Sequence, residues 1–293
     1  MLSLNWPEST RNVDSLGVEQ KKYESMRLER MMPMIPIIAR LDGKAFHTFT
    51  KGLNRPFDIN LQQCMQNTML ILSEKFNVDL AYTQSDEISL VWYNTKSEKI
   101  IFDGRSDKYT SLLAATASVA FYKELLKFLP TKVKEVPIFD CRVFQVPNRQ
   151  IVFENIVWRW MDARKNSVSM LASSHFSDKE LHGRSTKQRK EMLNDIGVYW
   201  DNLTDACKTG TFCKRTEYLK EVTSEFKELI KDPITYDGKI YVKRKKFDLV
   251  FPPSLYCINL INTTLTSEEI SNDLQNKVDL IETIFSENIL SNV

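Results

Sequence analysis

The alternation of apolar and polar positions predicts strands and helices in a regular order along the first half of the chain. Short β-branched and aromatic runs bounded by polar residues predict strands, and apolar residues at helical spacing predict helices between them. The predicted strands are 35–42, 78–83, 88–93 and 138–146, and the predicted helices are 60–76 and 107–129. The order βαββαβ is the ferredoxin-like pattern. We therefore expect an α+β fold in which helices pack on an antiparallel sheet.

The rest of the chain has a weaker pattern. We expect a helix over 17–30, a loop over 47–59, a mostly helical stretch from 151 to about 230, a β region over 233–250 and a charged helical tail over 266–290. These elements divide the chain into a core over 1–150 and a mostly helical C-terminal region with a short β segment over 151–293. Small residues within 107–129 favour close packing of that helix on the sheet.

Composition narrows the possible classes of protein. The 293 residues carry a net charge of only +2, so any nucleic-acid contact must rest on local basic patches. No apolar run approaches the roughly 20 residues of a membrane span, and we expect neither a membrane segment nor a secretory signal. Five scattered cysteines, three histidines and no C-x-x-C pattern argue against a disulfide framework and a structural zinc site. We expect a cytoplasmic location, although an organelle is equally compatible.

Carboxylates stand where two predicted strands end. Asp42 closes the run IPIIARLDG, and Asp86 and Glu87 lie between the two strands of LAYTQSDEISLVWY. In a βαββαβ sheet these ends are neighbours, so the carboxylates would repel one another. A divalent cation relieves that repulsion, and Mg²⁺ is typically held by one or two carboxylates together with phosphate oxygens. The alternative is that both stretches are ordinary solvated turns.

Gly43 follows Asp42 directly and opens the stretch GKAFH at 43–47. Without a Cβ, its backbone could approach a phosphate or offer its carbonyl oxygen to a metal. The backbone N–H groups of 43–47, together with the Lys44 side chain, could bind a triphosphate. The stretch is not a Walker motif, because G-x-x-x-x-G-K is absent.

Several segments in order resemble the tRNA-His guanylyltransferase family of 3′–5′ nucleotide-adding polymerases. They are RLDGKAFHTF at 40–49, TQSDEISLV at 83–91, FDGRSDKYTSLLAATAS at 102–118, FDCRVF at 139–144, WRWMDARKNS at 158–167 and LHGRSTKQRKEML at 181–193, with a further match at 210–215. The resemblance implies a polymerase-palm sheet with two Mg²⁺ ions over 1–150, and a C-terminal region that completes the active site and contacts tRNA. It also implies ATP and GTP or other nucleoside triphosphates as substrates, tRNA as partner, and a homotetramer.

The same resemblance assigns roles to individual residues. Asp42, Asp86 and the Gly43 carbonyl would hold the metal, and Glu87 would support this catalytic carboxylate pair. The implied nucleotide-binding residues are Gly43, Lys44, Ala45, Phe46, His47, Arg55, Asp58, Ser85, Arg105, Lys108, Ser111 and Asn166. The implied tRNA-binding residues are Arg159, Arg164, Lys187, Arg189 and Lys190.

The chain departs from the family in places that bear on the substrate. Where the guanylyltransferases carry H-I-N-N-L-Y-N, this chain has Arg164 in place of the histidine and keeps only the first asparagine, Asn166. These changes resemble the guanylyltransferase-like proteins that repair 5′-truncated tRNAs, so we favour template-directed 5′-end repair. The alternatives are guanylylation of tRNA-His itself, a non-catalytic tRNA-binding protein and a nucleotide cyclase.

Further charged positions have both a functional and an ordinary interpretation. Arg159, Asp162, Asn166 and Ser169 form a polar stripe at helical spacing, with Val157, Trp158, Met161 and Val168 on the other faces. Such a stripe is usually the solvated side of a helix. Arg105 and Lys108 at a helix start would favour a bound anion, and the basic runs at 182–190 and 243–246 could contact phosphates. For 243–246 we favour a solvated surface.

Overall fold

The computed structural model describes residues 18, 21–23, 29–94, 100–222, 234–236 and 239–250. Residues 18 and 21–23 are helical, as the expected helix over 17–30 requires, but its predicted end is wrong, because residues 29 and 30 are not helical and Arg30 forms an isolated β-bridge with Arg105. The other residues of that prediction are outside the described residues. The expected tail helix over 266–290 is outside them as well. In the parts of the chain that are described, no helix is long and apolar enough to cross a lipid bilayer.

Four strands and two long helices form the ferredoxin-like core. They are β1 (Ile37–Gly43), α3 (Ile59–Lys75), β2 (Leu80–Gln84), β3 (Glu87–Trp92), α4 (Ser106–Phe128) and β4 (Phe139–Gln145). The strands lie in the order β4-β1-β3-β2 and every neighbouring pair is antiparallel. The predicted βαββαβ pattern is therefore confirmed. The short elements α2 (Phe46–Phe49), η1 (Ile101–Gly104) and η2 (Pro130–Lys132) connect these units, and α2 lies partly in the predicted loop.

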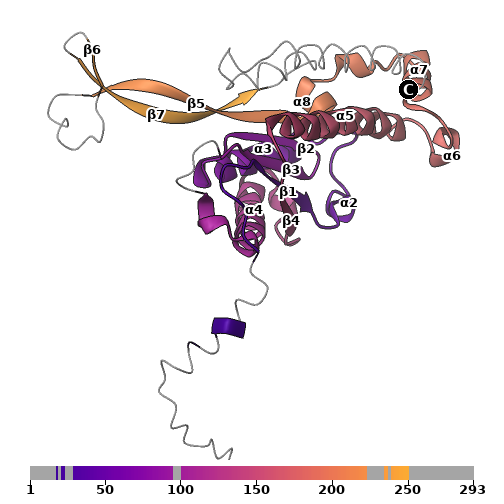
Figure 1. Cartoon of the computed structure of the whole chain (residues 1–293). Coiled ribbons are helices and arrows are strands. Elements are labelled where there is room, and N and C mark those ends of the chain that lie inside the picture. Colours follow the sequence, from indigo (N-terminus) through magenta and orange to yellow (C-terminus); the bar gives the residue numbers. More distant parts are fainter. Residues whose placement is uncertain are drawn as a thin grey trace, which may run out of the picture.

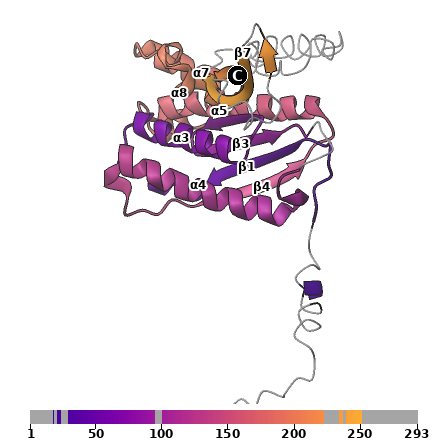
Figure 2. The ribbon, with the colours of Figure 1, turned by 90° about the vertical axis from the view of Figure 1, so that its left-hand side faces the viewer.

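The sheet is covered on both faces (Figures 1 and 2). The first face packs on α3 and α4 through a core that includes Leu41, Met69 and Phe121. Ala117 and Ala120 of α4 are buried, so the small residues do bring this helix close to the sheet, whereas Ala115 faces solvent. Alternation along each strand sends the other side chains to the second face.

A third long helix, α5 (Arg149–Ser173), covers that second face. Its residues Val152, Ile156 and Trp160 pack on Ile38 and Tyr82 of the sheet. The helix begins immediately after β4, and the side chain of Asn148 caps it by accepting the backbone N–H of Ile151 at 3.0 Å. The predicted regions 1–150 and 151–293 therefore pack on one and the same sheet. The division of the chain at residue 150 remains a prediction.

Beyond α5 the chain is helical for a shorter distance than the pattern predicts. The remaining elements are α6 (Asp178–Leu181), α7 (Thr186–Asp195), η3 (Trp200–Asn202), α8 (Asp205–Thr209), β5 (Thr211–Val222), β6 (Ile234–Tyr236) and β7 (Lys239–Val250). The expectation of helix to about 230 is wrong from Thr211, because β5 pairs with the open edge of β2. The β region predicted over 233–250 is confirmed, and β5 and β7 form a long two-stranded arm that extends away from the core (Figure 1).

Candidate active site at the end of the first strand

The predicted carboxylates meet at one end of the sheet. Asp42 at the end of β1 lies opposite Glu87 at the start of β3, and the backbone N–H of Gly43 donates to the carbonyl oxygen of Asp86 at 3.1 Å. Asp86 belongs to the two-residue turn between β2 and β3, in which Ser85 adopts a left-handed φ of 48°. A non-glycine residue in this conformation is uncommon and is often found at functional sites.

Burial and mutual repulsion raise the pKa of both aspartates. For Asp42 the largest cause is burial, followed by the charges of Glu87 and Asp140, while Arg40 and Arg142 act in the opposite direction. For Asp86 burial is again the largest cause, and the charge of Asp42 adds to it. In the described part of the chain neither aspartate forms an ion pair with a lysine or an arginine. Their negative charge is therefore left for a ligand to balance.

Glu87 differs from the two aspartates because the protein balances its charge. Its carboxylate accepts the Nε–H of Arg159 at 3.0 Å, a second bond from the same guanidinium, and the amide of Gln84 at 3.2 Å. Arg159 is 6 % exposed. The prediction that Glu87 supports the carboxylate pair fits this geometry. The prediction that Arg159 contacts tRNA does not, because its guanidinium is buried and occupied by carboxylates.

Contacts connect three of the four residues of the predicted polar stripe of α5. Arg159 lies 3.2 Å from the carboxylate of Asp162, and the amide of Asn166 donates to the same carboxylate at 3.2 Å. Ser169 is joined to α7 instead, because its hydroxyl accepts a bond from Arg189 at 2.8 Å. The stripe is therefore more than a solvated face, since its first three residues lead to the glutamate at the sheet and its last residue holds α7.

A cavity of about 660 Å³ opens beside the carboxylates. Its size suits a nucleotide-sized ligand. Of the predicted nucleotide-binding residues, it is lined by Gly43, Ala45, Phe46, His47, Arg55, Asp58, Ser85 and Asn166, and also by Asp86. Lys44, Arg105, Lys108 and Ser111 are outside this lining.

The stretch 43–47 supplies fewer free donors than expected. The Lys44 N–H donates to the carbonyl of Ile138 at 2.8 Å and so extends the pairing of β1 with β4. In the described chain the N–H groups of Ala45, Phe46 and His47 have no protein acceptor, as is normal at a helix start. Gly43 is required for a reason other than close approach to a phosphate, because a Cβ there would overlap the ring of Phe46.

Asp58 lines the cavity but has a structural role. Its carboxylate accepts the N–H groups of Asn60 and Leu61, each at 3.0 Å, and that of Asn54 at 3.1 Å. It is 8 % exposed and is the N-cap of α3. Nucleotide binding by this carboxylate would require it to give up the cap, which stabilises a helix by about 1 kcal/mol.

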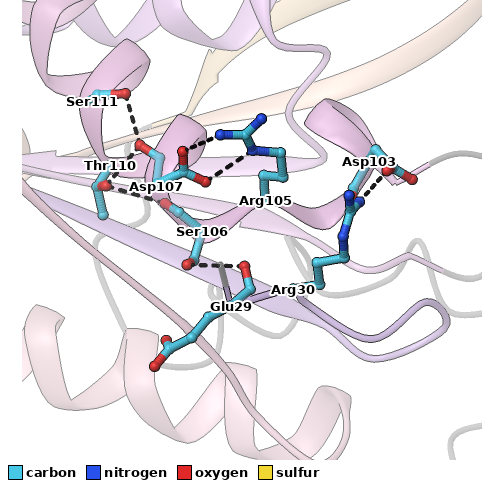
Figure 3. Close-up of polar contacts among 8 residues, drawn as sticks. All are labelled: Glu29, Arg30, Asp103, Arg105, Ser106, Asp107, Thr110 and Ser111. Atoms are coloured by element: carbon cyan, nitrogen blue, oxygen red, sulfur yellow. Dashed lines mark hydrogen bonds and ion pairs between the residues drawn. The ribbon is translucent and has the colours of Figure 1, made fainter. Parts of the chain in front are cut away.

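Three of the predicted nucleotide-binding residues lie at the other end of the sheet. The start of α4 carries Arg105, Lys108 and Ser111, and it lies next to residues that precede β1. The carboxylates lie at the opposite end of the sheet, where β1 ends. Seven residues of strand separate the two ends, roughly 20 Å. Figure 3 shows Arg105 and Ser111 with Asp107: both oxygens of Asp107 accept bonds from Arg105, at 3.1 and 2.6 Å, and Ser111 donates to the carbonyl of Asp107 at 2.7 Å. The anion expected at this helix start is the protein's own Asp107, so these residues do not belong to the carboxylate site of the same chain.

Two of the predicted tRNA-binding residues, Arg164 and Lys190, lie around Trp200 together with Lys208. The Lys190 ammonium lies 3.7 Å from the centre of the indole, the Arg164 guanidinium 5.4 Å and the Lys208 ammonium 5.7 Å. Burial, with the charges of Arg164 and Lys208, lowers the pKa of Lys190 although Asp201 opposes the shift. Lys187 is exposed on α7, and Arg189 ties α7 to α5 through Ser169. In 243–246, Arg244, Lys245 and Lys246 are exposed on β7, as expected for a solvated surface.

Sequence reasoning missed several residues of the site. Gln84 and Asp140 face the same side of the sheet as Asp42, as strand alternation alone could have indicated. Gly210 also lines the cavity, with a φ of 83°, and a Cβ there would come within 2.5 Å of the Thr83 carbonyl oxygen. Lys208 gave no signal, because its partners come from α5, α7 and η3.

Known proteins resemble this chain in sequence and fold. The tRNAHis guanylyltransferase family profile matches residues 18–147. The tRNA(His) guanylyltransferase of Schizosaccharomyces pombe is 32% identical over 240 residues, which span 77% of this chain and 86% of the relative. That of Saccharomyces cerevisiae is 28% identical over 205 residues, 63% of this chain and 84% of the relative. A solved bacterial tRNA(HIS) guanylyltransferase (Thg1)-like protein in complex with ATP is 30% identical, with a TM-score of 0.63, over 69% of this chain and 87% of the other.

Together the palm-like sheet and these similarities define a nucleotidyltransferase whose fold is that of a polymerase palm. The chain belongs to the tRNAHis guanylyltransferase family.

Proposed function

We propose that the protein is a Mg²⁺-dependent nucleotidyltransferase that extends the 5′ end of tRNA in the 3′–5′ direction, and that it repairs 5′-truncated tRNAs. The observation that carries the proposal is the pair of aspartates, Asp42 and Asp86. They lie together beside a nucleotide-sized cavity, and neither forms an ion pair with a lysine or an arginine of the described chain.

The donor set fits Mg²⁺ better than a metal caged by the protein alone. Among the described residues no group of three or more histidine, cysteine, aspartate or glutamate side chains is arranged to hold a metal. Asp42 and Asp86, with the carbonyl of Gly43, would therefore supply part of the ligands, and the phosphates of the substrates would supply others. When bound, the cations neutralise phosphate charge and activate the attacking oxygen.

The residues of the chain would orient the substrates. The free N–H groups of Ala45, Phe46 and His47 would bind the phosphates of a nucleoside triphosphate in the cavity, with the Ser85 hydroxyl beside them. Asn166 would contact the same nucleotide from α5. Arg159 holds Glu87 away from the cation, which leaves the two aspartates as the side-chain ligands.

The chemistry would proceed in two transfers. An oxygen of the 5′-monophosphate of the RNA attacks the α-phosphate of ATP or GTP, and pyrophosphate leaves. The 3′-hydroxyl of an incoming nucleotide then attacks the activated 5′-phosphate, loses its proton, and releases the nucleoside monophosphate. No covalent bond to the protein is needed, so positioning and charge neutralisation would supply the catalysis.

The substrate preference rests on the C-terminal region. Arg164, at the position of the family's histidine, joins Lys190 and Lys208 around Trp200 in a basic cluster that suits RNA phosphates. A guanidinium there binds phosphate without reading a base. This supports the repair reaction over recognition of tRNA-His, and a homotetramer remains an expectation from the family.

One experiment separates the candidate functions. The purified protein receives ATP, nucleoside triphosphates and Mg²⁺ with either a tRNA lacking its first 5′ nucleotide or an intact tRNA-His. Extension of the truncated tRNA supports repair, and extension of intact tRNA-His alone overturns it in favour of guanylylation. Extension of neither, with tight tRNA binding, identifies a non-catalytic binding protein.

A further inference from the structure

Trp158 is an exposed aromatic side chain beside the carboxylate site. The helical pattern places Trp158 with Val157 among the apolar residues of α5, which predicts burial. Val157 is indeed buried, but Trp158 is 54 % exposed, so the pattern does not predict the exposure of this residue. Burying an indole is one of the largest apolar gains open to a side chain, so an indole kept in solvent next to a site calls for a physical reason.

One side of the indole is fixed to the active site. The Arg159 guanidinium lies 4.7 Å from the centre of the ring, and the same guanidinium bonds to Glu87 and Asp162. Since Glu87 lies opposite Asp42, a short chain of contacts connects the indole to the carboxylate site. Arg159 is buried and doubly paired, so the platform under the ring is rigid.

Two arginines on the same side of the sheet have the charge of Asp42 near them, with which they form no ion pair. Arg40 of β1 and Arg142 of β4 are directly opposite each other, one alternation step from Asp42 and Asp140. Like charges in this position are destabilising. In the described chain neither guanidinium has a hydrogen-bond or ion-pair partner, and Arg142 is exposed. A phosphate group would compensate both charges.

An aromatic platform and two arginines without ion-pair partners, all on the face of the sheet that α5 covers, are a combination that can bind a nucleic-acid strand end. We propose that Trp158 stacks on the nucleobase at the 5′ end of the RNA substrate, and that Arg142 with Arg40 binds a phosphate of that strand. The proposal deepens the proposed function, on which it rests, by naming the contacts that position the RNA end. The nucleoside triphosphate, in contrast, occupies the cavity lined by 43–47.

The test measures binding of an acceptor-stem RNA hairpin with a 5′-monophosphate to the full chain and to Trp158→Ala and Trp158→Phe. Tyr23→Ala is the control, because Tyr23 is an exposed aromatic, at 62 %, in the helical segment that precedes the sheet in the chain. Alanine removes the ring on which the base would stack, whereas phenylalanine keeps most of the stacking surface. We therefore expect RNA binding to weaken about 10-fold with Trp158→Ala, less than about 3-fold with Trp158→Phe, and not at all with the control.

A second RNA with an abasic 5′ nucleotide makes the test specific to stacking. If the base stacks on Trp158, removal of the base and removal of the ring are not additive, and Trp158→Ala binds both RNAs equally. The proposal is overturned if the losses of RNA affinity from the two changes add up. It is also overturned if Trp158→Ala and Trp158→Phe weaken RNA binding equally, or if a variant raises only the KM for the nucleoside triphosphate. Arg142→Ala should reduce the slope of log K against log salt by about 0.7 to 0.9.

Binding is measured without nucleotide or metal, so it does not depend on turnover. A protein that binds the RNA through Trp158 but never extends it refutes the proposed function and leaves the stacking inference intact. A protein that extends the RNA equally well with alanine at 158, at sub-saturating RNA, refutes the stacking inference alone.

Discussion

Glu87 and Arg159, 72 residues apart in the chain, form a buried ion pair that joins the sheet to the helix on its second face. The pair lies directly beside Asp42 and Asp86, which the described chain leaves unpaired. Of these three carboxylates the protein thus neutralises one and leaves two without an ion pair in the described chain. In the proposed function, these two aspartates would hold the divalent cations.

Breaking that pair should destabilise the fold strongly. Arg159→Ala leaves the Glu87 carboxylate buried without its partner, so we expect the free energy of unfolding to fall by about 3–5 kcal/mol. Denaturant titration measures the change. The double variant Arg159→Met with Glu87→Gln should recover most of the loss, and a loss below about 1 kcal/mol in the single variant would contradict the account.

Neutralising the unpaired aspartates should have the opposite effect on stability. The pKa of Asp86 is higher in the folded protein than in the unfolded chain. The wild-type protein therefore loses stability as the pH rises from the unfolded-state pKa through the folded-state pKa of this group. Asp86→Asn removes that loss. In metal-free buffer at pH 7 it should therefore be at least as stable as the wild type while losing nucleotidyl transfer. A variant that is clearly less stable would show that Asp86 is a structural residue.

Strand order was the most predictable feature of the site. The ferredoxin-like pattern places the end of 35–42 beside the turn at 85–86, so the meeting of Asp42 and Asp86 follows from local patterns. The position of Arg105 did not follow, because a helix of 23 residues carries the chain from one end of the sheet to the other. The burial of Arg159 was also hidden, since a polar stripe does not reveal which neighbour it faces.

The strand β5 shows a second limit of local reading. Its sequence TFCKRTEYLKEV mixes charged and apolar residues in a way that also suits a helix. The edge of β2 decides its conformation, because four of its residues pair there, from Thr211 to Lys214. Pairing between segments about 130 residues apart leaves no signal within either segment.

Two glycines with nearly equal φ values provide a comparative test of the cavity wall. Gly210 and Gly52 have φ values of 83° and 82°, but only a Cβ at Gly210 would meet another atom, the Thr83 carbonyl oxygen at 2.5 Å. Gly52→Ala should cost only backbone strain of about 1 kcal/mol. Gly210→Ala adds a clash, and about 1–3 kcal/mol more is expected from overpacking. Equal losses in thermal or urea unfolding would contradict the packing described here.

Glu124 should give the fold a pH dependence away from the site. It is 3 % exposed, and although burial raises its pKa, bonds from Lys127 at 2.5 Å and Asn67 at 2.7 Å lower it overall. The ionised Glu124 carboxylate therefore stabilises the fold fully at pH values above its pKa in the unfolded chain, near 4.3. This stabilisation is lost as the pH falls through the lower pKa of the group in the folded protein. Glu124→Gln should therefore be less stable by about 1–3 kcal/mol at pH 7. The difference should narrow at acidic pH, and a gap that widens there would be inconsistent with this sign.

The basic cluster around Trp200 predicts a salt effect on RNA binding. Arg164→Ala and Lys208→Ala should each reduce the slope of log K against log salt by about 0.7 to 0.9, because each removes one phosphate contact. Filter binding of tRNA at several salt concentrations measures the slope. Arg244→Ala on β7 is a surface control with the same charge change, and an equal reduction with that variant would mean that only net charge matters.

The central claim is that Asp42 and Asp86 together hold the cation for nucleotide addition at a tRNA 5′ end. Single-turnover addition of a labelled nucleotide to 5′-truncated tRNA, with Mg²⁺, tests it in the wild type, Asp42→Asn, Asp86→Asn and the control Asp178→Asn, which makes the same change at an exposed position on α6. We predict that either of the first two variants is slowed by more than about 1000-fold, equivalent to roughly 4 kcal/mol, and that the control keeps most of its rate. Addition that continues within about 10-fold of the wild-type rate in both Asp42→Asn and Asp86→Asn would contradict the account.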